Sequence, residues 1–528
     1  MKISMPEIKT PGACLEELRK RAPKYIWLTF AAAVVLGIAT HLYMLVNKLP
    51  NHDDIGHLFS FDYGTASGRW LLPLVARMDG AFSIPWFIGL ISVLCLAGTA
   101  CFTVSLLRIR SVPGCAIAAA IIVSFPTVTA TFTFMFTATP YFFSLMLAAF
   151  GAYAAVRFRP IWGFVLGAAA ITLSMGIYQS YLGVAAVLMV GALLFETLDG
   201  KDSFGALFLK GVRMAGALVC SVAAYMVIVR ITTRNIALVD YMGISDMGKI
   251  SLQELPWQLV KCFGSYYKFF ISDAYGYHFG FLKFAFAATA LCCIVLGVLL
   301  LRERRLGRSR TVLALALAAV YPLAANLIYL MVPNGGIHTL MIYGLSYILI
   351  APVALVDYTE INWQKLSRRA VQAIAGWVVL LSMTAAAYSY AVTANTAYLK
   401  IDLSLRQATA YSTRLLERIE SCEGYHRDLP VMLLGSGIVD DGLWPTPQLN
   451  SVEMVGVFSL AHFRTSYSYN YFLRYYLGYT GEIYLDSSDG APSFSEVDEV
   501  RAMPTYPEQG SIRVINGWVV VKLNETAG

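Results

Sequence analysis

The chain has 528 residues, of which 57% are hydrophobic and only 14% are charged, and its mean hydropathy is +0.61. Soluble domains carry about 25% charged residues, so this composition excludes a soluble globular protein. The net charge of +7 is unevenly divided, because residues 394–528 sum to −6 and the rest of the chain sums to +13. No basic stripe runs along the sequence, which argues against nucleic acid as a partner.

Long apolar runs recur from the N-terminal region to about residue 393. A helix needs about 20 apolar residues to cross a bilayer, and these runs approach or exceed that length. The sequence therefore predicts an α-helical polytopic membrane protein with about eleven transmembrane helices. The predicted spans are 25–46, 84–107, 113–131, 140–156, 161–177, 180–195, 214–231, 284–301, 311–332, 338–356 and 371–393. A single kinked span in place of the fifth and sixth would reduce the count to ten.

The distribution of Lys and Arg predicts the orientation of the spans. With a cytoplasmic N-terminus, the inner segments carry 21 Lys and Arg, whereas the much longer outer segments carry nine when Arg230, at the outer end of the span 214–231, is included. Cytoplasmic loops are the positively charged ones. An odd number of spans then places the C-terminal region outside the cytoplasm.

Two regions follow from this topology. Residues 1–393 form the transmembrane domain, with substantial outer loops at 47–83 and 232–283. Residues 394–528 form an extracytoplasmic C-terminal α/β module, since a helical pattern at 399–419 is followed by strand-like runs. The predicted strands are 430–434, 512–515 and 517–522.

No Asp, Glu, Lys or Arg lies in the apolar centre of any predicted span, and His41 and Asn326 are the main polar exceptions. Ion-coupled transporters keep ionisable groups at mid-membrane, so their absence argues against that class. The first outer loop is different, because it places Asp53 and Asp54 directly after the first span, between His52 and His57, with Arg69 further on. One carboxylate could act as a general base towards a sugar hydroxyl while the other braces the loop, and Arg69 could hold a phosphate.

Two other interpretations of this loop remain open. Asp-Asp and Gly are ordinary residues of solvated turns. The two histidines together with the two aspartates could also hold a metal ion, although their spacing is unspecific.

The chain resembles the GT-C class of membrane glycosyltransferases, which carry an acidic pair in the first outer loop. The run Asp53-Asp54, then Gly68-Arg69-Trp70-Leu71, with Tyr178-Gln179 later, is similar to the Gtr type-II glucosyltransferases, which modify O-antigen and related surface polysaccharides. This resemblance covers residues 1–393 in layout and the first loop in detail.

The resemblance implies roles for particular residues. Asp53 or Asp54 would be the catalytic base, with Asp54 preferred, and Arg69 would contact the donor phosphate. Tyr178 and Gln179 could line the sugar site. Outside the family pattern, His52 and His57 are further candidates for the sugar site, and His338 is one for the phosphate. Arg230, Arg234 and Lys268 could also bind the carrier phosphate, or could face anionic lipid headgroups instead.

The predicted function is transfer of a hexose, with glucose implied by the resemblance, from a polyprenyl-phosphate carrier to a surface glycan at the outer face of the bacterial inner membrane, with inversion. The alternative is a flippase or transporter of lipid-linked sugars or polysaccharide. No cofactor is required in principle, and a divalent metal (Mg or Mn) stays open. The partners would be the lipid-linked donor, the glycan acceptor, membrane lipid, and separate proteins that load and flip the carrier.

Overall fold

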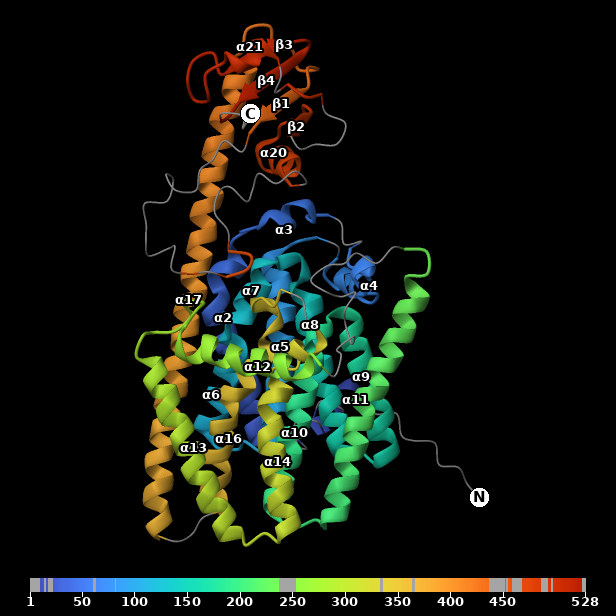
Figure 1. Ribbon diagram of the computed structural model, residues 1–528, viewed down its shortest axis with the longest axis vertical. Helices are drawn as coiled ribbons and strands as arrows, with labels where there is room; N and C mark the ends of the chain where they lie inside the picture. The colour runs from blue at the N-terminus through green and yellow to red at the C-terminus, as the bar shows by residue number, and fades with distance from the viewer. Residues whose placement is uncertain are drawn as a thin grey trace.

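The computed structural model is mostly helical, with a small sheet near the C-terminus (Figure 1). Nine helices in the part of the chain it describes are long and apolar enough to cross a membrane. The described residues are 10–13, 16–17, 22–59, 63–80, 82–236, 253–332, 336–362, 366–435, 452, 454–457, 468–485, 492–494 and 497–524.

Ten of the eleven predicted spans fall largely on α-helix, whereas the span predicted at 338–356 begins with two 3₁₀ turns and becomes α-helical only from Ser346. The helices are α2 (Lys24–Val46), α5 (Pro85–Leu107), α6 (Val112–Ser124) with α7 (Pro126–Thr133), α8 (Met135–Arg157), α9 (Pro160–Ile177), α10 (Leu182–Asp199), α11 (Phe204–Thr232), α13 (Leu282–Arg304), α14 (Arg308–Ala325), α16 (Ser346–Asn362) and α17 (Leu366–Glu420). Only α14, which starts with two arginines and contains Pro322, and the 17-residue α16 do not reach the length and hydropathy of the other nine.

The third predicted span is broken into α6 and α7 at Phe125. Pro126 occupies the first turn of α7, where its missing N–H costs nothing, but it cannot continue the hydrogen-bond ladder of α6. Within the bundle, His41 accepts or donates at both ring nitrogens, 2.7 Å from the Tyr398 hydroxyl and 2.8 Å from the Val123 carbonyl. This buried histidine therefore joins helices, as a polar residue inside a helix bundle is expected to do.

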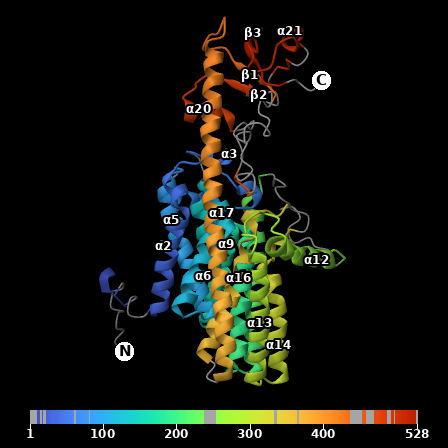
Figure 2. The same ribbon diagram turned by 90° about the vertical axis from the view of Figure 1, so that its left-hand side faces the viewer.

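The second outer region contains α12 (Leu255–Tyr266), which lies across the ends of the upright helices in both views (Figures 1 and 2). Its exposed face is apolar and includes Trp257, Val260 and Phe263. This is the pattern of an amphipathic helix in a membrane interface.

The C-terminal module is joined to the bundle by one continuous helix. The 55 residues of α17 run for about 80 Å at 1.5 Å per residue, from the bundle to the module (Figure 2). The boundary predicted at 393/394 lies inside this helix, because the amphipathic run that follows the last span extends it without a break. The module is therefore held by a rigid rod and not by a linker.

The module's sheet has the strand order β2-β1-β4-β3. Its strands are β1 (Val431–Leu434), β2 (Ile483–Leu485), β3 (Ile512–Ile515) and β4 (Trp518–Lys522). β1 pairs in parallel with β2 and β4, whereas β3 and β4 form an antiparallel hairpin. The three strands predicted from the sequence are confirmed, and β2 was missed because it is only three residues long.

Candidate functional site

The first outer loop begins with a short helix, α3 (His52–Gly56), that carries both predicted carboxylates. Asn51 caps it: the Asn51 side chain accepts the N–H groups of Asp53 and Asp54, and the Asp54 carboxylate accepts the Asn51 N–H. This reciprocal arrangement satisfies backbone donors that the start of a helix leaves unpaired.

Asp54 is fully buried and fixes the loop to the start of α8. Its carboxylate accepts the backbone N–H of Phe136 at 2.9 Å and of Met135 at 3.3 Å. The start of a helix favours a negative charge there. Burial nevertheless dominates and raises the pKa of Asp54 to about 6, although the charge of Lys48 and these backbone hydrogen bonds oppose it. Asp54 is thus the residue of the pair that braces the loop.

Asp53 is the accessible member of the pair, with 33% of its side chain exposed. The His52 Nε2 lies 3.4 Å from its carboxylate. His57 does not turn towards the carboxylates, because its Nδ1 bonds the Asp53 backbone carbonyl at 2.8 Å and its ring stacks on Phe136 at 4.5 Å. Across the described residues, no three His, Cys, Asp or Glu side chains are grouped so that they could hold a metal ion.

A half-buried cation lies within electrostatic range of this carboxylate site. The Lys48 Nζ donates to the Ser83 carbonyl at 2.8 Å, which joins the beginning and the end of the first outer loop. Burial lowers the pKa of Lys48, and the charge of Asp54 opposes that shift. Lys48 was not among the predicted site residues, although its place directly after an apolar span was visible in the sequence.

Arg69 follows a tight turn whose backbone only glycine adopts readily. Gly64 and Gly68 flank a short 3₁₀ turn with φ of 92° and 74°. The Arg69 guanidinium donates to the Tyr141 hydroxyl at 2.9 Å and lies 5.2 Å from the centroid of the Tyr178 ring. The two tyrosine rings are stacked 4.3 Å apart, so Arg69 is held over an aromatic pair by a cation–π contact.

The hairpin between α9 and α10 holds this turn in place. The Gln179 side-chain amide donates to the Ser67 carbonyl at 3.0 Å, and the Tyr225 hydroxyl donates to the Gly68 carbonyl at 3.2 Å. Gln179 also donates to that hydroxyl. Gln179 is buried, so its donor groups are used to position the Arg69 turn.

His338 lies within electrostatic range of Arg69, on the loop before α16. Burial, with a smaller contribution from the Arg69 charge, lowers the pKa of His338 to about 4, so it is a neutral imidazole near pH 7. The phosphate contact predicted at this position is therefore a neutral hydrogen-bonding group.

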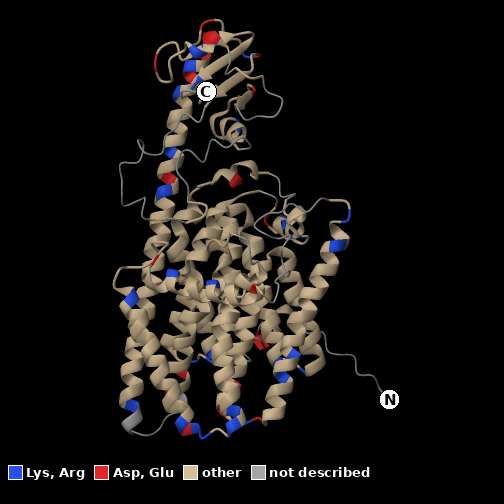
Figure 3. Ribbon diagram, in the orientation of Figure 1, with Lys and Arg blue, Asp and Glu red and all other residues tan. Residues whose placement is uncertain are grey.

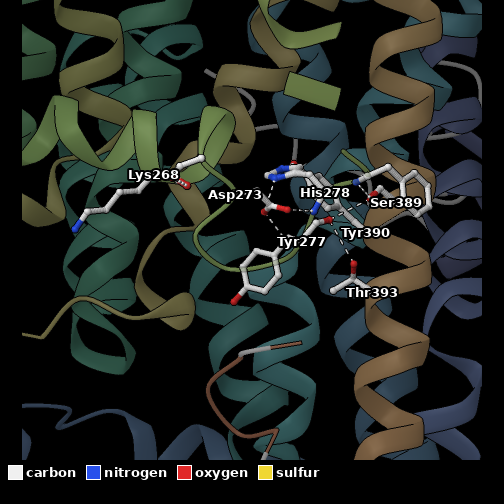
Figure 4. A network of polar contacts seen from close by, with 9 residues as sticks. Lys268, Asp273, Tyr277, His278, Ser389, Tyr390 and Thr393 are labelled. Carbon is white, nitrogen blue, oxygen red and sulfur yellow. Dashed lines mark hydrogen bonds and ion pairs between the residues drawn. The ribbon is translucent and has the colours of Figure 1, made fainter. Parts of the chain in front are cut away.

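A polar network anchors the loop next to His338 (Figure 4). The Tyr277 and Thr339 hydroxyls are 2.7 Å apart. The neighbouring His278 bonds the Asp273 carboxylate with Nδ1 and the Tyr390 hydroxyl with Nε2, both at 3.0 Å, and thereby ties this loop to α17. The role of this network is to fix the second outer region against the bundle.

The remaining predicted cations do not join the site. Arg230, Arg234 and Lys268 are exposed. Within the described chain their side chains make no hydrogen bond or ion pair, and Lys268 points away from the network in Figure 4. Their positions at the outer ends of helices suit anionic lipid headgroups, the alternative role of such residues.

Asp79 is a buried carboxylate that the sequence analysis missed. It ends a 3₁₀ turn (Ala76–Asp79) packed on α8, and neither of its oxygens has a hydrogen-bond partner among the described residues. Burial raises the pKa of Asp79 to about 6. Tyr63 is within electrostatic range of Asp79, Asp54 and Arg69 at once, so these groups share one site.

A proline in α8 explains the place of Tyr63. Pro140 has no N–H to offer the Phe136 carbonyl four residues earlier. The Tyr63 hydroxyl donates to that carbonyl instead, at 3.0 Å. The first outer loop is therefore bound to both the N–H and the C=O of Phe136, through Asp54 and Tyr63 respectively.

These elements define a mostly helical protein with nine candidate membrane-spanning helices in the described part of the chain. Carboxylates, an arginine and stacked tyrosines gather where its first outer loop meets α8 and the α9–α10 hairpin. Residues 42–349, more than half of the chain, match the model of the glucosyl transferase GtrII family. The chain belongs to this family of glycosyltransferases. The match covers the site residues described above except Tyr390, and it ends before the C-terminal module. No curated protein and no solved structure matches the chain.

Proposed function

We propose that the protein transfers a glucosyl unit from a polyprenyl-phosphate carrier to a hydroxyl of a surface glycan, with inversion at the anomeric carbon. The observation that supports this best is the spacing of groups along α8. Phe136 holds the Asp54 end of the first loop and Tyr141 holds Arg69. Phe136 and Tyr141 are five positions apart, which corresponds to a rise of about 7.5 Å along the helix axis. This rise leaves room for a sugar between a base and a phosphate-binding cation.

Asp53 is the base in this proposal. A general base must reach the proton that it accepts, and Asp53 is exposed whereas Asp54 is buried and engaged by backbone donors. The acceptor oxygen attacks the anomeric carbon and its proton passes to Asp53. The bond from the anomeric carbon to the phosphate oxygen breaks, and its electron pair stays on the carrier phosphate.

Arg69 stabilises the negative charge that the departing phosphate gains. Its stacking on Tyr178 and its bond to Tyr141 orient the guanidinium before substrate binds. His338, as a neutral imidazole, supplies a hydrogen bond to the same phosphate. Tyr178 also lines the sugar site, and Gln179 positions the turn that carries Arg69.

This chemistry takes place at the outer face of the bacterial inner membrane, with the N-terminus cytoplasmic. In support, Lys and Arg gather at the end of the bundle opposite the module (Figure 3), which is the cytoplasmic pattern. The chain then depends on other proteins to load the carrier and move it across the membrane.

The test is transfer by the purified protein in liposomes, with polyprenyl-phosphate glucose as donor and bacterial surface polysaccharide as acceptor. Asp53→Asn should reduce kcat by about 10²–10⁴, the usual contribution of a general base. Asp498→Asn, at a carboxylate that is 99% exposed in the module, is the matched control and should be silent. Wild-type transfer that survives Asp53→Asn would reject Asp53 as the base. Movement of the labelled carrier across the liposome without transfer would favour the flippase.

A further inference from the structure

Helix α20 (Tyr469–Leu477) lies between the module and the first outer loop (Figures 1 and 2). Its inner face packs into the module core, and Ile55 of α3 belongs to the same buried cluster as Phe472. The charge of Asp54 contributes to the raised pKa of Tyr476, so α20 also lies within electrostatic range of the site. The module therefore covers α3 through this helix.

The outward face of α20 carries a row of exposed aromatic rings. Tyr471 and Tyr475 are 42% and 43% exposed and stack with centroids 5.9 Å apart. The row continues onto the first outer loop, where Phe59 meets Tyr475 edge-on at 5.2 Å and Phe82 meets Phe59 at 6.3 Å. A continuous exposed apolar patch of this kind, formed by two parts of a fold, is typical of a binding surface.

A polar cavity lies at the module end of this row. Its volume is about 480 Å³, within the range of roughly 300–1,000 Å³ that small-molecule sites occupy. Tyr471 forms part of its wall together with Arg474 and Glu482, which bring charges of both signs, and with Asn470. Within the described chain, the Arg474 guanidinium makes no hydrogen bond or ion pair.

The ring at the cavity end of the row, Tyr471, also lies next to the helix that carries the proposed base. The Tyr471 ring lies 3.8 Å from the position that a Cβ of Gly56 would take. Gly56 is three residues after Asp53 in α3, and residues three apart lie on one side of a helix. The row thus links the cavity in the module to the exposed carboxylate.

We propose that this surface, the α20 face (Tyr471, Tyr475, Phe59, Phe82 and the cavity at Arg474), binds the acceptor glycan along several sugar units and delivers its end to Asp53. This inference rests on the proposed function. Pyranose rings present an apolar C–H face to aromatic rings and hydroxyls to charged and amide groups, which matches rings that alternate with Arg474, Glu482 and Asn470. The core of a protein interface would instead be depleted in charges. The net charge of −6 over residues 394–528 disfavours an anionic lipid surface or polyanion.

The test measures glycan binding in the absence of donor. The full-length protein in detergent is applied to an array of immobilised bacterial polysaccharides, including O-antigen chains released by mild acid. Wild type should bind at least one of them, and Tyr471→Ala and Tyr475→Ala should each raise Kd about tenfold, the usual effect of removing an anchoring tyrosine. Tyr267→Ala, at a ring that directly follows α12 and is 62% exposed, should leave Kd unchanged because it is not part of the α20 face. Both α20 variants should keep the wild-type thermal midpoint, because their rings are exposed.

The outcomes separate this inference from the proposed function. Asp53→Asn should abolish transfer and still bind the polysaccharide, and binding by a wild-type protein that transfers nothing would sustain the α20 face alone. Absence of wild-type binding to every polysaccharide, or equal Kd for wild type and both α20 variants, would overturn the inference. So would unchanged glycan binding accompanied by a shift from dimer to monomer in light scattering, which would make the α20 face an interface between copies of the chain.

Discussion

Gly176 is the point at which the Arg69 turn rests on the helix bundle, and it offers a direct test of how the site is positioned. Its carbonyl accepts the N–H of Leu71 at 2.9 Å, and the Trp70 indole covers its Cα. A Cβ at this position would lie 2.6 Å from two carbon atoms of the Trp70 ring. Gly176→Ala must therefore displace the indole and, with it, the turn that carries Arg69.

The size of the effect follows from this contact. Forcing an extra methyl group into a packed site costs about 1–3 kcal/mol, whereas Ala in a helix interior gains up to about 1 kcal/mol over Gly. If the strain is relieved by a movement of the turn, Arg69 loses its orientation towards the substrate, and activity decreases more than stability does. We expect kcat/KM for transfer to drop by roughly 5- to 150-fold, which is 1–3 kcal/mol at 1.36 kcal/mol per factor of ten.

The assay compares transfer and thermal unfolding for Gly176→Ala, for Gly297→Ala and for Gly176→Ala combined with Trp70→Phe. Gly297 lies in α13 with nothing within 4 Å of its would-be Cβ, so its substitution should be neutral or stabilising. Trp70→Phe removes the two ring carbons that clash and should restore part of the lost activity, as a double-mutant cycle would reveal. Wild-type transfer by Gly176→Ala, or no recovery in the double variant, would refute the reasoning.

Two further predictions concern the buried carboxylate of Asp79 and the Gln179 side chain that holds the Arg69 turn. The pKa of Asp79 is raised by burial to about 6, so the folded protein binds more protons than the unfolded chain and loses stability as pH rises from about 4 to 6. Asp79→Asn should therefore raise the thermal midpoint at pH 8 and have little effect at pH 4, and an equal shift at both pH values would contradict this. Gln179→Ala leaves the Ser67 carbonyl without its side-chain donor, at a typical cost of about 1–3 kcal/mol, and should raise the KM for the lipid-linked donor about tenfold while retaining the fold by circular dichroism. An unchanged KM would mean that the Arg69 turn keeps its position without the hydrogen bond from Gln179.

The helices could be predicted because an apolar run is a local signal. The runs 25–46, 84–107 and 284–301 became helices with bounds within a few residues of those predicted. The end of the last span could not be read, because the residues after 393 switch from an apolar to an amphipathic pattern while remaining helical. The composition of the sequence changes at residue 393, whereas the backbone of α17 continues as a helix through this point.

The site was only partly readable for a different reason. The sequence predicted that neighbouring carboxylates point apart, with one bracing the loop, and preferred Asp54 as the base. Which one is buried depends on the N–H groups of Met135 and Phe136, about 80 residues away, and these now favour Asp53 in the proposed role. Asp79 escaped notice because a lone carboxylate before a glycine is typical of a solvated turn, and only packing on α8 removes it from water.

The first two turns of α8 act as the frame of the site. Its opening N–H groups hold Asp54, and the carbonyl left without a partner by Pro140 accepts from Tyr63. One residue further on, Tyr141 holds Arg69. Pro140 thus leaves a free backbone carbonyl that accepts a hydrogen bond from the first outer loop. This contact lies next to the N–H groups that hold Asp54 and one turn before Tyr141, which holds Arg69. Because both anchors belong to one helix, helical geometry fixes how far apart along α8 the acidic and the cationic parts of the loop are attached.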